Sequence, residues 1–135
     1  MCFFSRPYLA CALGRQACDF GYKVLYLGMV RFLEMINQSH VDGTFIKLIN
    51  RMEKIDVLIL DDFGIQNISA NQRIALLQVL EDRYATKSII ITSQLPVANW
   101  HQYFNSSTTA DAIMDRLTAN AHRFELKGES MRKKK

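Results

Sequence analysis

The chain has 135 residues, of which 49% are apolar and 22% are charged. That length suits one domain, and that balance is typical of a folded globular chain rather than a disordered one. No apolar run approaches the ~18 residues that a membrane-spanning helix needs, and the apolar stretch at the N-terminus is too short for a signal peptide.

The net charge of +4 is concentrated at the C-terminus. Residues 132–135 are Arg-Lys-Lys-Lys, so the rest of the chain is formally neutral and lacks the composition of a basic DNA-binding surface. We expect residues 131–135 to form a flexible basic tail after a core of residues 1–130. The tail is either an arm that contacts phosphate or a solvated end.

The three cysteines are Cys2, Cys11 and Cys18. On a helix, Cys11 and Cys18 would lie roughly 10 Å apart along the axis, which is beyond the reach of a disulfide. Free thiols together with the lack of an export signal indicate a reducing, cytoplasmic environment.

The first half of the chain alternates between helical and strand patterns. Residues 8–20 are rich in Ala, Leu and Cys and precede Gly21, which predicts a helix with a glycine stop. A short apolar run over 23–27 favours a strand. Residues 29–53 have apolar side chains at helical spacing, with a predicted break at Gly43.

The second half continues this alternation. Strands are predicted over 56–62, 88–94 and 123–126, and helices over 70–85 and 111–121. Ser69 is placed to cap the helix over 70–85. The predicted apolar stripe of that helix is Ile74, Leu77, Leu80 and Tyr84, with Leu76 alongside.

Two strands are continuously apolar, with VLIL at 57–60 and IIIT at 89–92. Runs without polar alternation indicate strands that are buried on both faces, as in a parallel sheet. The predicted fold class is therefore α/β, a three-layer domain with a parallel sheet and helices on both of its faces.

The end of the strand at 57–60 carries two acids, Asp61 and Asp62, which is the Walker B pattern. A buried strand delivers such side chains to the carboxyl edge of the sheet, where ligands of open α/β folds bind. Asp61 can hold hydrated Mg²⁺, and Asp62 can orient or deprotonate an attacking water. The alternative is a buried strand whose acids merely begin a loop.

The strand over 88–94 also ends in polar residues. In a nucleotide-binding sheet, the strand beside the acidic one places a polar side chain near the γ-phosphate and the attacking water. Thr92, Ser93 and Gln94 are the candidates, and a simple transition from strand to loop is the alternative.

Six motifs together carry a family resemblance. They are LILDDFG (58–64), LEDRY (80–84), IIITSQLP (89–96), Trp100-His101, ADAIMDRL (110–117) and LKGESMRKK (126–134). In this order and spacing, the chain resembles the ATPase core of the IstB-type transposition helper proteins. These are relatives of the DnaC helicase loaders within the AAA+ superfamily, and the likeness covers nearly the whole chain.

The resemblance implies a P-loop, AAA+-type core that binds ATP and Mg²⁺. It places Asp61 and Asp62 at the Walker B positions, with Asp61 holding the metal through water. It places Gln94 at the sensor-1 position with Ser93 beside it, so that Asp62 and Gln94 would act on the attacking water.

Arg116, in Asp115-Arg116-Leu117, matches the arginine that AAA+ subunits insert into the nucleotide site of a neighbour. An arginine suits that task because its charge is permanent and its guanidinium binds phosphate with two donors. From the residues alone, the alternative is a helix-surface arginine that pairs with Asp111 or Asp115.

Two other motifs have structural interpretations. Arg83, in Glu81-Asp82-Arg83-Tyr84, is expected to form an ion pair at a helix end and is not assigned to catalysis. Trp100 and His101 are expected to anchor a packed loop rather than to form a site.

The chain departs from the family pattern at its N-terminus. The family has a first strand followed by the phosphate loop GxxxxGK[ST], and here Arg6-Pro7 stands where the Lys-Ser/Thr pair would be. The apolar residues Met1 to Phe4 are expected to be too few to replace the strand. We therefore expect an N-terminally truncated core that lacks the first strand and the loop, with weak or absent ATP binding.

The function that the resemblance implies is that of an ATP-binding helper of DNA transposition. DNA, a transposase and other AAA+ subunits of its own kind would be its partners. The missing loop leaves open whether this chain hydrolyses ATP. The alternatives are a helicase loader of DNA replication and a non-enzymatic remnant that acts only as an interaction module.

Overall fold

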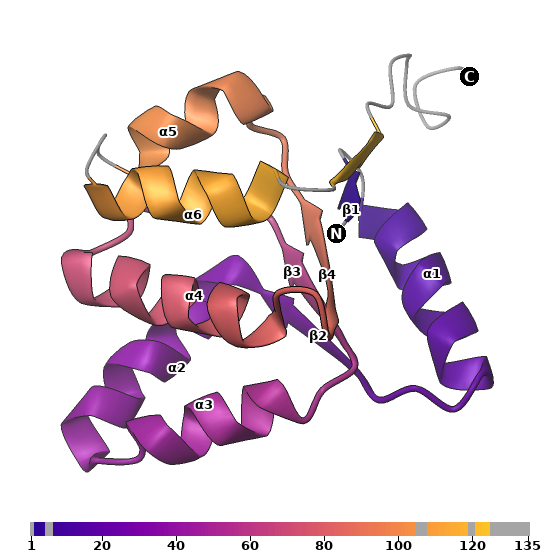
Figure 1. Ribbon diagram of the computed structural model, residues 1–135, viewed down its shortest axis with the longest axis horizontal. Coiled ribbons are helices and arrows are strands. Elements are labelled where there is room, and N and C mark those ends of the chain that lie inside the picture. Colours follow the sequence, from indigo (N-terminus) through magenta and orange to yellow (C-terminus); the bar gives the residue numbers. More distant parts are fainter. Residues whose placement is uncertain (1, 5–6, 105–107, 119–120, 125–135) are drawn as a thin grey trace, which may run out of the picture.

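A computed structural model of the chain describes residues 2–4, 7–104, 108–118 and 121–124 (Figure 1). The elements in chain order are β1 (Cys2–Phe4), α1 (Pro7–Asp19), β2 (Val24–Gly28), α2 (Met29–Asp42), α3 (Phe45–Glu53), β3 (Val57–Asp61), α4 (Ala70–Arg83), β4 (Ser88–Thr92), the 3-10 helix η1 (Val97–Asn99), α5 (Trp100–Tyr103), α6 (Thr108–Thr118) and β5 (His122–Phe124). Within these ranges, no helix has the length and apolar character that crossing a bilayer requires. The predicted tail at 131–135 lies outside the described residues.

The strands form one five-stranded sheet of order β2-β3-β4-β1-β5, and every pairing is parallel. This confirms the predicted α/β class, but the expectation that the first strand is missing was wrong. β1 lies inside the sheet and pairs with β4 on one side and β5 on the other. Three residues are enough because β5 is itself three residues long, so Cys2–Phe4 pairs with it in register along its whole length.

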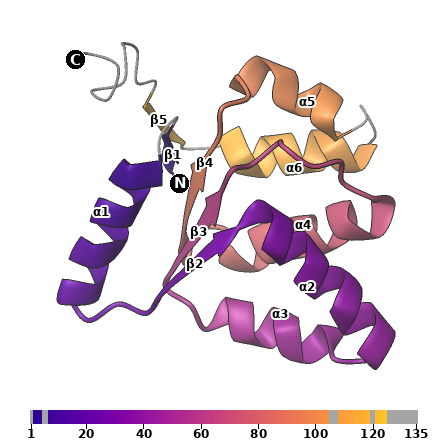
Figure 2. The same cartoon turned by 180° about the vertical axis from the view of Figure 1, so that it is seen from behind.

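The helices cover both faces of the sheet, as predicted. Figures 1 and 2 show α1 on one face and α2 to α6 on the other. Leu58, Leu60, Ile89 and Ile91 belong to the larger core beneath α2 to α6. The side chains that alternate with them pack against α1, where Ile59 and Ile90 form a small cluster with Ala10.

Gly14 allows α1 to approach the sheet closely. A Cβ atom at this position would lie 2.8 Å from Cδ1 of Ile59 and 3.4 Å from Cγ1 of Val24. The first distance is shorter than carbon atoms tolerate, so a larger residue would require either the Ile59 side chain or the helix to shift. The glycine therefore fixes how tightly α1 packs on its face of the sheet.

The sequence signals at the helix ends are confirmed. The Ser69 side chain accepts a hydrogen bond from the backbone N–H of Gln72, and the Gln72 side chain accepts one from the backbone N–H of Ser69. This reciprocal pair is a capping box, which satisfies two donors at the start of α4. Gly43 ends α2 in the left-handed region at φ 76°, which glycine adopts without strain.

The predicted apolar stripe of α4 was wrong in part. Ile74 and Tyr84 are 59% and 46% exposed, whereas Ala75 and Val79 are buried. The buried face of α4 is shifted by one residue from the predicted stripe because the helix is contacted by α2, α3 and α6 rather than by one partner.

Among the residues that the structure describes, Arg83 has no acid at ion-pair distance, so the predicted ion pair is not found there. Its side chain is 2% exposed and donates hydrogen bonds to four backbone carbonyl oxygens. Nη1 lies 2.9 Å from Met52 O and 2.7 Å from Ile55 O, and Nη2 lies 3.0 Å from Asp56 O and 2.6 Å from Ser88 O. One guanidinium thus joins the end of α3 to the starts of β3 and β4.

Candidate functional site at the carboxyl edge of the sheet

Asp61 is the last residue of β3, and its carboxylate receives two hydroxyl groups from neighbouring strands. The Tyr26 hydroxyl, on β2, donates to Oδ2, and the Thr92 hydroxyl, on β4, donates to Oδ1. Asp61 is 9% exposed and Thr92 is 1% exposed. The predicted delivery of an acid to the edge of the sheet is therefore accompanied by two groups that hold it.

The strand register explains why these three side chains meet. Tyr26 lies opposite Ile59 and Leu60 lies opposite Ile91, so Asp61 and Thr92 follow as the next pair. Because side chains alternate along a strand, Tyr26, Asp61 and Thr92 share the face that α1 covers. Asp61 and Thr92 are the last residues of their strands, Tyr26 lies two positions before the end of β2, and α1 begins at this carboxyl edge after β1 ends.

Asp62 differs from Asp61 in conformation and exposure. Its backbone adopts φ 57°, in the left-handed region that a non-glycine residue seldom occupies, and its side chain is exposed. The Asp62 backbone N–H donates to Thr92 Oγ1 at 3.2 Å, and the Phe63 N–H donates to Thr92 O at 2.9 Å. Thr92 thus holds the chain reversal that turns Asp62 away from the strand.

Ser93 and Gln94 follow β4 in different settings. The Ser93 hydroxyl donates to Phe63 O at 2.5 Å and accepts from the Leu95 N–H at 3.0 Å, so it holds two loops together. The Gln94 side chain is exposed, and no hydrogen-bond partner of it is found in the described part of the chain. Of the three candidates on this segment, Thr92 is the one that the structure brings to Asp61.

An aromatic cluster supports the loop after Asp62. The Phe63 ring packs against Trp100, Tyr103 and Phe104, with centroids 4.8, 5.5 and 5.6 Å apart. Trp100 is 1% exposed, and its Nε1–H donates to Leu95 O at 2.8 Å. The prediction that Trp100 anchors a packed loop is therefore confirmed.

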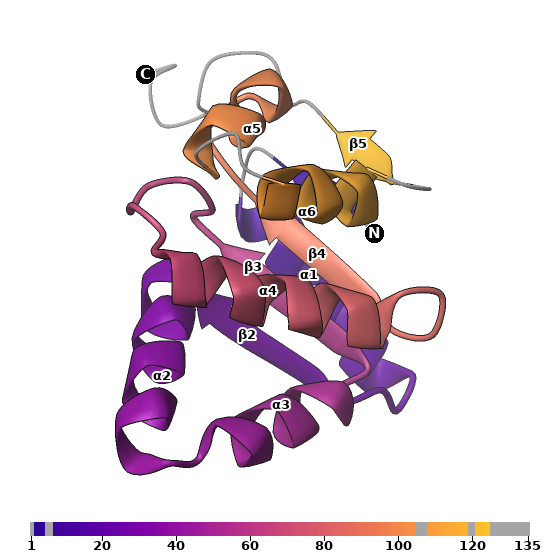
Figure 3. The same ribbon diagram turned by 60° about the vertical axis from the view of Figure 1, so that its left-hand side comes forward.

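Arg116 lies at the other end of the domain from Asp61. Its side chain contacts α4, with Nη2 3.5 Å from Glu81 Oε1 and the guanidinium carbon 4.9 Å from the centroid of the Tyr84 ring. Figure 3 shows α4 and α6 side by side. Since α4 joins the end of β3 to the start of β4, its last turn lies toward the amino edge of the sheet.

The partner of Arg116 is therefore Glu81, not Asp111 or Asp115. Asp111 instead lies 2.5 Å from Nε2 of His101, which joins the start of α6 to α5. Sequence neighbours suggested a pairing within α6, but the packing of α6 on α4 brings Glu81 closer. With a side chain 37% exposed, Arg116 is not buried inside its own domain.

Tyr26 was not among the predicted site residues. Burial, the hydrogen bond to Asp61 and nearby acidic groups, Cys11 among them, raise its pKa above the ordinary value of 10.0. A polar-tipped aromatic residue in an otherwise apolar strand, two positions before the strand's end, was the available signal. Sequence alone did not show that β2 would pair with β3 in the register that brings Tyr26 to Asp61.

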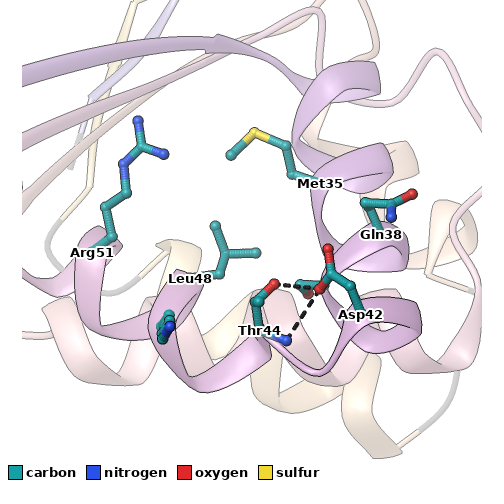
Figure 4. Close-up of a pocket in the computed structure, with 8 residues that line it drawn as sticks. Met35, Gln38, Asp42, Thr44, Leu48 and Arg51 are labelled. Carbon is teal, nitrogen blue, oxygen red and sulfur yellow. Dashed lines mark hydrogen bonds between the residues drawn. The ribbon is translucent and has the colours of Figure 1, made fainter.

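A separate pocket of about 290 Å³ opens between α2 and α3 (Figure 4). It is lined by Met35, Gln38, Ser39, Asp42, Thr44, Lys47, Leu48 and Arg51. Asp42 accepts a hydrogen bond from the Thr44 backbone N–H at 3.2 Å, which holds the turn between the two helices. None of the predicted site residues lines this pocket.

The acidic side chains at the carboxyl edge are of the kind that can hold a hydrated magnesium ion. Each Asp61 oxygen accepts one hydroxyl, which leaves lone pairs that can accept hydrogen bonds from metal-bound water, and the exposed Asp62 follows directly in the chain. Mg²⁺ keeps several of its waters and needs only one or two protein carboxylates.

Comparison with known proteins identifies the family. The family of IstB-like ATP binding proteins matches residues 4–135 of the chain. The chain belongs to this family. An insertion-sequence ATP-binding protein of Sinorhizobium fredii is 44% identical over 128 residues, which covers 95% of this chain and 52% of that relative. This IstB-like chain spans about half the length of the curated relatives it matches.

Solved structures show the same fold. DnaI matches with a TM-score of 0.78 at 20% identity, over 91% of this chain and 71% of that one. The DnaC helicase loader matches with a TM-score of 0.73 at 18% identity, over 94% of this chain and 77% of that one. The IstB-like chain therefore shares the fold of DnaI and the DnaC helicase loader, which agrees with the predicted α/β class.

Proposed function

We propose that this chain is the ATP-binding core of an AAA+ helper protein that assists a transposase in moving an insertion sequence on DNA. The observation that carries the proposal is the family match over residues 4–135, combined with a buried carboxylate, Asp61, at the carboxyl edge of a parallel sheet. The relatives are named as insertion-sequence ATP-binding proteins, which supports transposition as the setting.

In this proposal Asp61 and Asp62 have different roles. Asp61, held by Tyr26 and Thr92, would bind hydrated Mg²⁺, which would neutralise charge on the phosphates. The exposed Asp62 would orient or deprotonate the attacking water. Gln94, on the loop after β4, would contact the same water or the γ-phosphate, with Ser93 holding that loop.

The lack of the phosphate-binding loop determines the affinity for ATP that we expect of this chain. No GxxxxGK[ST] motif occurs in the sequence, so the backbone donors of that loop are missing. Hydrogen bonds to charged groups contribute ~1.5–3 kcal/mol each, so the loss of three would weaken binding at least roughly 10³-fold. We therefore expect a dissociation constant for Mg·ATP of about 1 mM or weaker and no measurable hydrolysis by this chain alone.

Calorimetric titration of the 135-residue chain with Mg·ATP tests this prediction. The Asp61→Ala variant should bind at least about fivefold more weakly, because it loses the carboxylate that holds the metal. A second readout is the alkylation of Cys11, whose thiol lies near Tyr26, with Cys18 on the same helix as the internal control. Saturating Mg·ATP should slow the reaction of Cys11 and leave that of Cys18 unchanged.

One result would contradict the proposed site, and another would contradict the expected weak affinity. Equal binding by the unchanged chain and by Asp61→Ala would remove the metal site from the carboxyl edge. A micromolar dissociation constant, or Mg²⁺-dependent phosphate release that Asp61→Ala abolishes, would show that the missing loop is not needed.

The second candidate is an interaction module without its own ATPase activity. In that case Arg116 would serve the nucleotide site of a neighbouring subunit, as its exposed position on α6 allows. The likeness to the DnaC helicase loader is one of fold at 18% identity, so helicase loading receives less support than transposition. Co-purification with a transposase or with a replicative helicase would separate those two settings.

A further inference from the structure

We propose that Tyr26 is a positioning residue that fixes the orientation of the Asp61 carboxylate for metal binding. The inference rests on the proposed function of Asp61 and extends it to a strand that the family motifs do not include. Its basis is a hydrogen-bonded bridge across three strands, Tyr26 on β2, Asp61 on β3 and Thr92 on β4.

The two hydroxyl groups bind opposite oxygens of one carboxylate. Thr92 donates to Oδ1 and Tyr26 donates to Oδ2, so rotation of the carboxylate about its terminal bond would break both hydrogen bonds. With only the threonine in place, the carboxylate could pivot about that single bond. The hydrogen bond from Tyr26 therefore fixes the plane of the Asp61 carboxylate, which the bond from Thr92 alone would leave free to rotate.

Tyr26 is poorly explained as a core residue. It is 44% exposed, and its neighbours Leu25 and Leu27 pack into the large core on the other face of the sheet. Since β2 is the edge strand beside β3, its tyrosine can reach over the end of β3 from the outside. A phenylalanine would fill the same space, so what the tyrosine adds is the hydrogen bond to Asp61.

A fixed carboxylate plane has a consequence for metal binding. Each oxygen has one lone pair already used by a hydroxyl, so the remaining lone pairs point in set directions. The waters around Mg²⁺ are held in a rigid octahedron, so their hydrogen bonds also have set directions. A carboxylate that is already oriented accepts these hydrogen bonds best. Loss of the Tyr26 hydroxyl should therefore weaken metal binding without removing either acid.

The test compares Tyr26→Phe with Tyr22→Phe, a matched control at an exposed tyrosine just before β2. The first readout needs no metal or nucleotide, namely a double-mutant cycle with Asp61→Asn in urea unfolding. We expect Tyr26→Phe to lower the folding equilibrium constant about tenfold in the unchanged background. In the Asp61→Asn background the effect should fall below about threefold, since the acceptor is then neutral.

The second readout is the binding of Mn²⁺ to the full chain, measured by electron paramagnetic resonance. Tyr26→Phe should raise the Mn²⁺ dissociation constant about five- to tenfold, and Tyr22→Phe should leave it unchanged. A purely structural tyrosine would alter unfolding but not Mn²⁺ affinity, so coupling without a change in affinity overturns the proposal. Additive unfolding effects, or no Mn²⁺ binding by the unchanged chain, overturn it as well.

Failure of the proposed function and failure of the Tyr26 proposal change different binding measurements. If Asp61 is not part of a nucleotide site, Mg·ATP binding will be insensitive to Asp61→Ala while the Mn²⁺ comparison still reports on Tyr26. If Tyr26 has no positioning role, Mn²⁺ affinity will be equal in Tyr26→Phe and Tyr22→Phe while Asp61→Ala still weakens Mg·ATP binding.

Discussion

Arg83 shows how one buried residue can organise a fold. Burial lowers the pKa of its guanidinium to about 10, so it stays charged at neutral pH. The charge is balanced by carbonyl dipoles and by the nearby Asp56 carboxylate rather than by an ion pair with Glu81 or Asp82, the acids that precede it in the sequence. Those acids suggested an ion pair because a sequence shows neighbours along the chain and not the carbonyls that folding gathers from α3, β3 and β4.

We expect Arg83→Met to destabilise the protein by about 3 kcal/mol, because four carbonyl oxygens lose donors that carry charge. Urea unfolding measures the change, with Arg15→Met on the exposed side of α1 as the control. Arg83→Lys should recover only part of the loss, since one ammonium cannot reach all four oxygens. A loss below about 1 kcal/mol for Arg83→Met would show that the carbonyls find other donors.

For the residues of the candidate site, too, the sequence shows neighbours along the chain but not the contacts that folding creates. Asp61 and Asp62 were predictable because an apolar strand that ends in acids can place them only at the edge of a sheet. Thr92 was one of three candidates, and only the register of β3 with β4 singles it out. Tyr26 was not predictable, since its role depends on a pairing between β2 and β3 that no local pattern specifies.

At the level of elements, Asp56 holds the starts of three strands together. Its carboxylate accepts a hydrogen bond from the Lys23 backbone N–H at 2.8 Å and from Lys87 Nζ at 2.9 Å. The bond from the Lys23 N–H and the bond and charge of Lys87 lower the pKa of Asp56 below its ordinary value of 3.8. Folding therefore favours the ionised carboxylate.

This shift predicts a pH dependence of stability. A carboxyl group whose pKa is lowered by folding stabilises the protein at pH values above its pKa in the unfolded chain. That stabilisation is lost as the pH falls through its pKa in the folded protein. Asp56→Asn should therefore be less stable than the unchanged chain at pH 6, and the difference should shrink below about pH 3.8. Urea unfolding at pH 6 and pH 3 measures both differences. A difference that is the same at the two pH values would exclude Asp56 as a source of acid sensitivity.

The elements themselves were largely predictable from periodicity, caps and glycines, and Ser69 and Gly43 are examples. The inner face of α4 was not, because a helix with neighbours on several sides buries residues that a single stripe does not include. The strand β1 was also missed. Three residues give too little pattern, and it forms because β4 and β5 leave a slot of matching length between them.

At the level of the whole molecule, the position of Arg116 favours a role between subunits. It lies toward the amino edge of the sheet, while Asp61 lies at the carboxyl edge, so one chain does not bring the two together. Its present contacts are weak, since surface ion pairs contribute less than about 1 kcal/mol and exposed cation–π contacts a similar amount. The arginine could therefore exchange Glu81 and Tyr84 for a neighbour's phosphate at little cost.

We predict that Arg116→Ala will change the free energy of unfolding by less than about 1 kcal/mol. When the chain is mixed with a full-length relative that has the GxxxxGK[ST] loop, the unchanged chain should support the relative's ATPase at least about tenfold better than Arg116→Ala does. Steady-state phosphate release measures this, with Arg51→Ala as an exposed control. Equal rates with Arg116→Ala and the unchanged chain would restrict Arg116 to holding α6 on α4.

The sheet order also sets a hierarchy of local opening. In the described part of the chain, β5 pairs with β1 alone, a strand of three residues, whereas β1 has a partner on each side. The outer strand can therefore detach by itself, but the inner one cannot leave without freeing both its neighbours. Since α1 follows directly from β1, release of β1 would also detach α1 from the sheet face on which Tyr26 and Asp61 lie. The stability of the acidic edge therefore depends on a few main-chain hydrogen bonds of β1, on the other side of the sheet.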